Sequence, residues 1–137
     1  MAVESVKEMV EAAKAEIENI SPSEAARRAK DEGALIVDIR DVREIQRDGA
    51  IPSAMHAPRG MLEFWVSPDS PYTKEIFGED REFILCCAGG MRSALSAKTL
   101  KDMGMEKVSH VETGFGGWKA DEMSVETYEE WKANRGR

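Results

Sequence analysis

Two adjacent cysteines, Cys86 and Cys87, stand where an apolar run meets the turn Ala88-Gly89-Gly90. Residues 83–101 contain three basic residues and no acidic residue, in a chain whose net charge is -7. Backbone N–H groups at a turn that enters a helix have no partner within the helix, so they bind anions. A cysteine beside such groups has its thiolate form favoured and can act as a nucleophile.

The position of each cysteine predicts its role. Cys87 lies in the turn and is the expected nucleophile, whereas Cys86 ends the apolar run and is expected to be a buried strand residue. The two glycines of the turn let the backbone approach a bound group closely. Arg92 has two open roles, because its side chain could contact the anion or point away and pin the loop.

Composition limits the classes of function. The chain has 137 residues, which predicts one domain, and its acidic balance disfavours nucleic acid and anionic membranes as partners. No apolar run approaches the ~20 residues of a membrane span, and the N-terminus does not resemble a signal peptide. The only two cysteines are adjacent, which excludes a disulfide framework and indicates a reducing compartment, expected to be the cytoplasm. Adjacent cysteines also lack the ligand spacing of a zinc site.

The hydrophobic pattern predicts alternating strands and helices. Helices are expected over residues 3–19, 22–32, 41–48, 91–103 and 125–133, and a helical turn over residues 60–66. Strands are expected over residues 34–39, 55–57, 83–87 and 108–111, and residues 114–118 read as a glycine-aromatic turn. The expected fold is α/β, a small parallel sheet flanked by helices on both faces, with the site beyond the carboxyl ends of the strands. Residues 1–20 are interpreted as an N-terminal helical extension and residues 21–137 as the domain.

Four segments together resemble the rhodanese family of single-domain sulfurtransferases, over residues 21–126. The loop from Cys87 to Ser93 reads as cysteine, four residues, arginine and serine. Residues 35–44 resemble the family's first strand with its Asp–Arg signature, here Asp38 and Arg40. Residues 49–54 resemble a Gly-His-Ile-Pro-Gly-Ala segment, with Ala50 in place of the usual histidine, and residues 112–118 resemble a Gly-Gly-x-x-x-Trp end.

The resemblance implies a transfer of sulfane sulfur in two steps, through a persulfide on Cys87. Thiosulfate or a persulfide would be the donor, and a thiol or cyanide would be the acceptor, with a protein donor or acceptor also open. Thiosulfate-preferring members often carry basic residues at the loop positions that correspond to residues 88–91, and none stands there in this chain. No metal or organic cofactor is implied, and Asp38 and Arg40 would give structural support. Substrate would be bound by the loop residues Ala88, Gly89, Gly90, Met91, Arg92 and Ser93, and Arg59 could attract an anionic donor at the pocket mouth.

Two other functions stay open at this point. Phosphatases and arsenate reductases of similar fold use a loop of cysteine, five residues and arginine, a count that fits only if Cys86 is the nucleophile. Rhodanese-like domains also serve as non-catalytic regulatory or partner-binding modules, and the N-terminal helix could support such a role.

Overall fold

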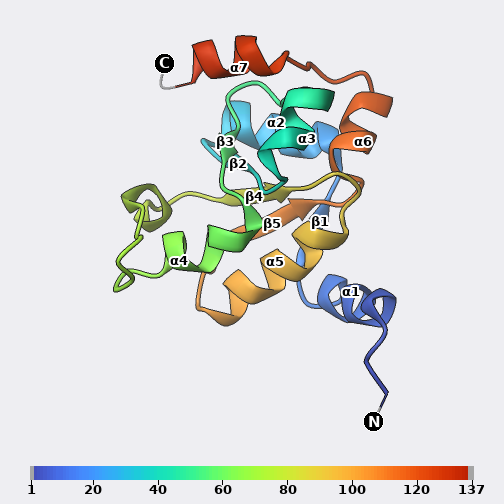
Figure 1. Cartoon of the computed structure of the whole chain (residues 1–137), viewed down its shortest axis with the longest axis vertical. Helices are drawn as coiled ribbons and strands as arrows, with labels where there is room; N and C mark the ends of the chain where they lie inside the picture. The colour runs from blue at the N-terminus through green and yellow to red at the C-terminus, as the bar shows by residue number, and fades with distance from the viewer. Residues whose placement is uncertain (1, 136–137) are drawn as a thin grey trace.

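The computed structural model, which describes residues 2–135, contains one parallel sheet. Its strands are β1 (Glu18–Ile20), β2 (Leu35–Asp38), β3 (Met55–His56), β4 (Phe83–Cys86) and β5 (Val108–Val111). They follow the order β1-β5-β4-β2-β3, and every neighbouring pair is parallel (Figure 1). The carboxyl ends of all strands therefore meet at one edge, where a site is expected in such a sheet.

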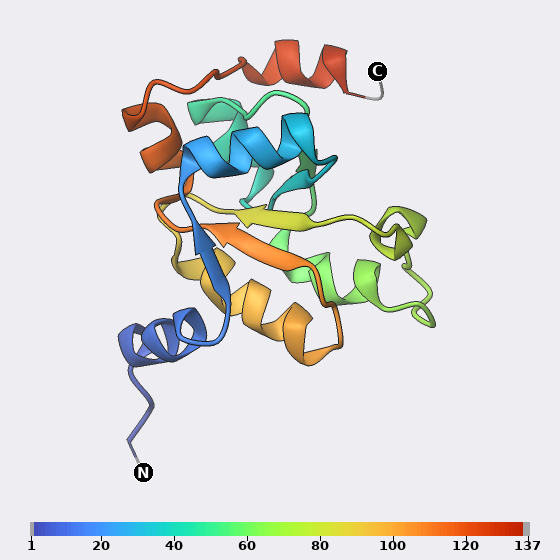
Figure 2. The ribbon, with the colours of Figure 1, turned by 180° about the vertical axis from the view of Figure 1, so that it is seen from behind.

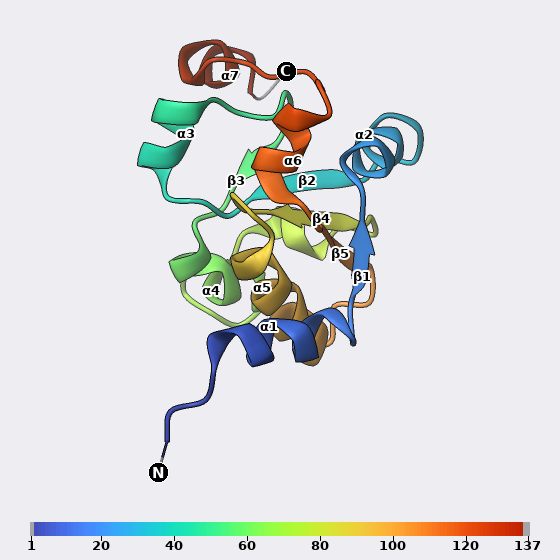
Figure 3. The same ribbon diagram turned by 90° about the vertical axis from the view of Figure 1, so that its right-hand side faces the viewer.

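Helices cover both faces of this sheet (Figure 3). One face carries α1 (Val6–Lys14), α4 (Leu62–Val66) and α5 (Met91–Asp102), and the other carries α2 (Pro22–Asp31), α3 (Val42–Asp48), α6 (Gly114–Ala120) and α7 (Tyr128–Asn134). The short 3₁₀ helices η1 (Arg59–Met61) and η2 (Glu75–Gly78) lie in the connections. This arrangement confirms the predicted parallel α/β fold with helices on both faces.

The sheet separates two apolar cores. Along β4, Phe83 and Leu85 point toward α5, whereas Ile84 and Cys86 point toward α2 and α6. All four residues are buried, as expected for a strand covered on both faces. The alternation continues to Cys87, which lies in the core on the α5 side. The two cysteines therefore occupy opposite faces of the sheet.

Local sequence signals set several helix ends. Ser21 accepts a hydrogen bond from the Glu24 N–H at the start of α2, and Pro22 occupies the first turn. Asp41 and Glu44 form a reciprocal capping box at the start of α3, which ends at Gly49 with φ of 98°. In α7, Thr127 and Glu130 repeat the capping box, so this helix begins later than the predicted residue 125.

The single helix predicted over residues 3–19 is wrong in its second half. Helix α1 ends at Lys14, and Glu18–Ile20 forms the edge strand β1 beside β5 (Figure 2). The Asn19 amide closes the connection by donating to the carbonyls of Lys14 and Ile17. Backbone pairing with β5 outweighs the weak helical propensity of this segment. The division of the chain after residue 20 stays a prediction, and β1 belongs to the same sheet as the rest.

Residues 114–118 form the start of helix α6, so the predicted glycine-aromatic turn is wrong. Glycine is a poor helix former in isolation, but here it permits close approach to the cysteine loop. A Cβ on Gly114, whose φ is +66°, would lie 2.5 Å from the Ala88 carbonyl oxygen. A Cβ on Gly117 would lie 1.9 Å from the Thr113 hydroxyl oxygen. Packing requirements therefore explain the glycines of this helix.

No helix within residues 2–135 is both long and apolar enough to cross a bilayer.

Candidate active site

Burial separates the two cysteines chemically. The Cys86 side chain is fully buried among apolar residues such as Ile84 and Phe115. Burial raises the pKa of the Cys86 thiol well above its usual range, and the Asp38 carboxylate adds to this effect. A thiol held neutral in an apolar core is a poor nucleophile. Cys86 therefore packs in the core, and Cys87 stays the candidate nucleophile.

The Cys87 sulfur lies in a cradle of backbone N–H groups at the start of α5. The Gly90 N–H donates to Sγ at 3.1 Å, and the Ser93 N–H donates at 3.3 Å. Gly90 has φ of 98°, a left-handed conformation that turns its N–H toward the sulfur. The positive end of the helix dipole adds to the same field. This geometry stabilises negative charge on Cys87 or on an atom bonded to it.

The loop is held from outside by helix α6. The N–H groups of Phe115 and Gly116 donate to the carbonyls of Cys87 and Ala88, at 2.8 Å and 3.0 Å. These bonds orient the carbonyls of Cys87 and Ala88 toward α6. Ala88 and Gly89 are exposed, whereas Cys87 is only 1% exposed. The sulfur thus lies at the bottom of the loop.

Arg92 is held by a contact outside the loop, whereas a contact between its side chain and a bound anion stays a prediction. Its guanidinium forms a two-pronged ion pair with the Glu44 carboxylate of α3, at 2.8 Å and 3.0 Å. The Arg92 guanidinium holds the pKa of Glu44 below its usual range, and the Asp41 N–H contributes. Arg92 therefore ties the loop to α3, and its charge is neutralised by this pair.

The Arg92–Glu44 pair predicts that the free energy of unfolding depends on pH in the acidic range. The pKa of Glu44 is lower in the folded protein than its value of 4.5 in the unfolded chain, so the ion pair stabilises the fold above pH 4.5. This stabilisation is lost as the pH falls through the pKa of Glu44 in the folded protein. Replacing Glu44 with glutamine should cost about 1 kcal/mol at pH 7. The difference between the two proteins should narrow as the pH is lowered below 4.5. Urea unfolding at several pH values measures this, and parallel profiles for the two proteins would contradict it.

A row of polar side chains leads away from the cysteine on the α5 face. The Cys87 Sγ lies 3.4 Å from the Ser93 hydroxyl, which lies 2.8 Å from His110 Nδ1. His110 Nε2 lies 2.7 Å from Asn19 Oδ1 on β1. His110 had no predicted role from the sequence, and Asn19 was predicted to lie in a helix. The available signal was the period of two along β5, which puts His110 on the same face as Val108.

Asp38 and Arg40 form a buried ion pair at the end of β2. The Arg40 guanidinium donates to Asp38 at 2.7 Å and to the Gly49 carbonyl at 2.8 Å. The Arg40 Cζ atom lies over the Phe115 ring, 4.1 Å from its centre. The pair therefore ties the ends of β2 and α3 to α6, which in turn holds the cysteine loop.

Arg59 borders a cavity that residues of the cysteine loop do not line. It is exposed on η1 and lines a shallow cavity of about 320 Å³ between α1 and α5, together with Met9 and Leu95. Contact between Arg59 and a substrate stays a prediction. Among residues 2–135, no group of three or more His, Cys, Asp or Glu side chains could hold a metal ion.

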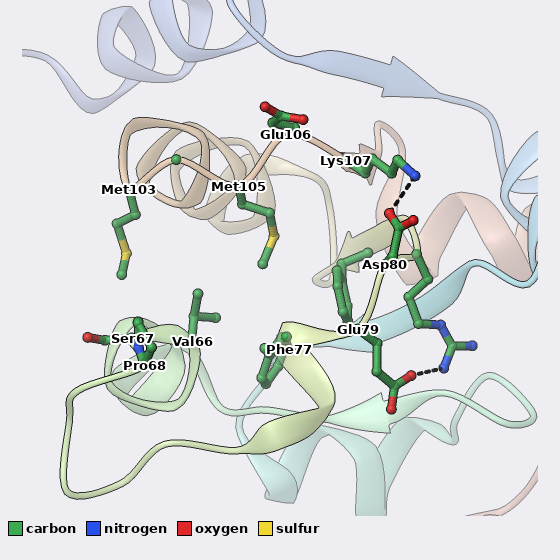
Figure 4. A pocket seen from close by; sticks show the side chains of 14 residues that line it. Val66, Ser67, Pro68, Phe77, Glu79, Asp80, Met103, Met105, Glu106 and Lys107 are labelled. Atoms are coloured by element: carbon green, nitrogen blue, oxygen red, sulfur yellow. Dashed lines mark hydrogen bonds and ion pairs between the residues drawn. The ribbon is translucent and has the colours of Figure 1, made fainter.

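A second cavity of about 400 Å³ lies at the amino ends of β4 and β5 (Figure 4). Val66, Phe77 and Met105 line its apolar side, and Asp80 pairs with Lys107 at its rim (Figure 4). Cys87 follows the carboxyl end of β4, at the opposite edge of the sheet. This cavity is therefore separate from the cysteine site.

Comparison with known proteins agrees with the geometry. The sequence model of the rhodanese-like domain matches residues 21–121. The Bacillus subtilis (strain 168) protein named "Putative sulfurtransferase YtwF" is 31% identical over 107 residues, which cover 77% of this chain and 94% of that protein. Thiosulfate sulfurtransferase GlpE of Glaesserella parasuis is 28% identical over 107 residues, covering 78% of this chain and 91% of GlpE.

A solved structure is also similar over nearly the whole chain. It is a Rhodopseudomonas palustris protein of unknown function, named "Possible Tyrosine Phosphatase", with 47% identity and a TM-score of 0.87. The alignment covers 92% of this chain and 97% of that one. The family match spans the Asp38–Arg40 pair, the whole cysteine loop and the start of α6. Because this match covers most of the chain, the protein belongs to the rhodanese-like domain family.

Proposed function

We propose that this protein is a sulfurtransferase that carries a sulfane sulfur as a persulfide on Cys87. The observation that carries the proposal is the pair of N–H groups, from Gly90 and Ser93, that donate to the Cys87 sulfur at the start of α5. Such fixed donors stabilise the charge of a thiolate before the reaction. Because these donors are already in place, the stabilisation of that charge costs no rearrangement.

The reaction consists of two displacements at sulfur. In the first, the Cys87 thiolate attacks the outer sulfur of the donor and a new S–S bond forms. The bond between that sulfur and the rest of the donor breaks, and sulfite or a thiolate leaves with the electron pair. In the second, a thiolate or cyanide attacks the terminal sulfur of the persulfide, and the Cys87 thiolate leaves. The sulfur atom is transferred and Cys87 is regenerated, as in other covalent catalysis.

Charges around the loop favour a persulfide donor over thiosulfate. Loop positions 88–91 carry no charged side chain, and the Arg92 guanidinium is paired with Glu44. Thiosulfate has two negative charges, so it would meet only N–H groups at this loop, without a free guanidinium. The persulfide of a small thiol places less charge there. We therefore propose that a persulfide of a small thiol or of a protein is the better donor.

Steady-state assays with cyanide as acceptor test this function. Thiocyanate formation should be measured with thiosulfate and with glutathione persulfide as donors. Both should support turnover, and kcat/KM for the persulfide should be higher by about tenfold, the effect of one missing charge-assisted hydrogen bond. If neither donor yields thiocyanate, the sulfurtransferase proposal is wrong. The non-catalytic partner-binding role would then be the one to pursue.

The phosphatase hypothesis has a structural argument against it. A loop of five residues before Arg92 requires Cys86 as nucleophile, and the Cys86 side chain packs on the face of the sheet opposite Cys87. Loops of four residues, counted from Cys87, enclose less space than a phosphate-sized cradle. The same preparation should therefore release no p-nitrophenol from p-nitrophenyl phosphate. Phosphatase turnover that exceeds thiocyanate formation would reverse the assignment.

We also propose that the reaction takes place in the cytoplasm. The expected partners are small sulfur-containing donors, thiol acceptors and a protein that delivers or accepts the sulfur. The exposed loop residues Ala88, Gly89 and Met91 are where such a partner would present its sulfur.

A further inference from the structure

We propose that Asn19 and His110 are positioning residues for Cys87. They hold the Ser93 hydroxyl so that it accepts a hydrogen bond at the sulfur and donates none to the thiolate. The inference rests on the proposed function only in taking Cys87 as the reacting sulfur. Ser93 and His110 lie inside the family match over residues 21–121, whereas Asn19 lies outside it, so the N-terminal segment supplies the residue that orients the row.

The orientation of the Asn19 amide begins the argument. Its NH₂ group donates to the carbonyls of Lys14 and Ile17, at 3.0 Å and 3.3 Å. A flipped amide would place its oxygen against two carbonyl oxygens, which is unfavourable. The Asn19 oxygen must therefore face β5. Asn19 is paired directly with His110 in the register of β1 and β5, which places this oxygen 2.7 Å from Nε2.

This oxygen sets the tautomer of His110. An amide oxygen only accepts, so Nε2 must carry the hydrogen and Nδ1 of a neutral ring must be the acceptor. Burial lowers the pKa of His110 to about 4, and the positive charge of Lys14 adds to the effect. The ring is therefore neutral at physiological pH. An aspartate at position 19 would have favoured the charged ring, whereas the amide does not.

The tautomer then sets the direction of the Ser93 hydroxyl. His110 Nδ1 accepts, so the Ser93 O–H donates to it across 2.8 Å. The hydroxyl has only one hydrogen, so it presents a lone pair to Cys87 Sγ at 3.4 Å. It accepts from the thiol and has no hydrogen left for the thiolate. Ser93 and His110 are both fully buried, so water does not offer an alternative partner.

Withholding this hydrogen bond has a chemical benefit. A thiolate becomes less nucleophilic as hydrogen bonds and charges stabilise it, and the best attacking thiol titrates near the ambient pH. The Gly90 and Ser93 N–H groups already stabilise the sulfur. A third donor from the hydroxyl would stabilise it further at the expense of its reactivity. The row from Asn19 to Ser93 prevents this.

Charged groups near the row come from three elements. Lys14 of α1 faces His110 and lies 3.9 Å from Glu112, which follows β5. Arg92 of α5 acts on the cysteine from the other side and is paired with Glu44 of α3. None of these groups is altered in the test below, so they form a constant background.

The test measures the rate of Cys87 alkylation by iodoacetamide as a function of pH, followed by intact mass. Two variants remove the acceptor in different ways. Asn19→Leu lets His110 take the other tautomer and donate to Ser93, and His110→Phe removes the ring nitrogens at similar size. Both should lower the midpoint of the pH profile by about one unit, because the hydroxyl becomes free to donate to the thiolate. The limiting rate at high pH should fall by about threefold.

Ser93→Ala provides the decisive background. If Asn19 and His110 act through the hydroxyl, neither substitution changes the profile when Ser93 is alanine. Ser109→Ala is the matched control, because Ser109 is equally buried on β5 but contacts Glu82 on the other face of the sheet. It should leave the profile unchanged.

Two outcomes would overturn the inference. One is a midpoint that stays constant or rises in a folded Asn19→Leu or His110→Phe protein. The other is a shift that persists fully when Ser93 is alanine, because the two residues would then act by another route. Alkylation needs no sulfur donor, so this experiment would still test the role of Asn19 and His110 if the protein transferred no sulfur.

Discussion

We expect Cys87→Ser to abolish thiocyanate formation and Cys86→Ser to retain most of it. A serine hydroxyl at position 87 would keep the contacts with Gly90 and Ser93 but is not ionised at neutral pH, so it cannot attack the donor sulfur. The Cys86 side chain faces the opposite core and takes no part in the loop. Turnover of the first variant should fall to the uncatalysed background with either donor.

The paired design controls for damage to the fold. Serine at position 86 buries a hydroxyl in an apolar core, which should lower the free energy of unfolding by about 1–3 kcal/mol. The Cys86 sulfur lies 3.5 Å from the Cys87 carbonyl oxygen, so the new hydroxyl has an acceptor at hand. Activity should therefore survive in Cys86→Ser despite its lower stability and vanish in Cys87→Ser. Equal losses in the two variants would contradict the assignment of Cys87.

Gly90→Ala should cause the largest loss of both stability and activity among the glycine variants. Gly90 has φ of +98°, and a Cβ there would lie 2.0 Å from the Glu112 carbonyl oxygen. The backbone would have to shift, at a cost of about 2 kcal/mol or more. The same shift would move the Gly90 N–H away from the Cys87 sulfur. Losing one preorganised donor should reduce kcat by about 100-fold.

Gly104→Ala is the control that separates the effect of backbone strain from that of a steric clash of the new Cβ. Gly104 has φ of +105°, but a Cβ there would meet nothing within 4 Å. This variant should lose about 1 kcal/mol from backbone strain alone and keep its sulfur transfer. Thermal unfolding and thiocyanate assays on both variants measure the two effects. A Gly90→Ala protein as active as Gly104→Ala would show that the loop geometry does not matter.

Long apolar runs made the centre of the fold predictable. Residues 34–39 and 83–87 read as buried strands because they contain few polar residues, and β2 and β4 lie there. The turn from β4 into α5 follows from Gly89 and Gly90. The candidate nucleophile was also chosen from this pattern, because Cys86 ends the apolar run and Cys87 lies in the turn that follows it.

Contacts between distant segments could not be read from local sequence. The ion-pair partner of Arg92 is Glu44, which lies 48 residues earlier in the chain, so the local sequence could not show this contact. The glycines of α6 made this helix look like a turn in the sequence, but they allow the helix backbone to lie close to the Ala88 carbonyl. Asn19 could be connected with His110 only once β1 was known to pair with β5. Each of these contacts depends on tertiary packing, which overrides local propensity.

The most direct test of the central claim is to locate the sulfur in the loaded protein. Wild-type protein is incubated with glutathione persulfide, freed of excess donor, digested and mapped by mass spectrometry under conditions that preserve persulfides. The two cysteines are adjacent, so fragment ions that break the bond between them assign the sulfur. The account predicts one additional sulfur atom on Cys87, removed by dithiothreitol or cyanide. An added sulfur on Cys86, or no added sulfur at all, would contradict it.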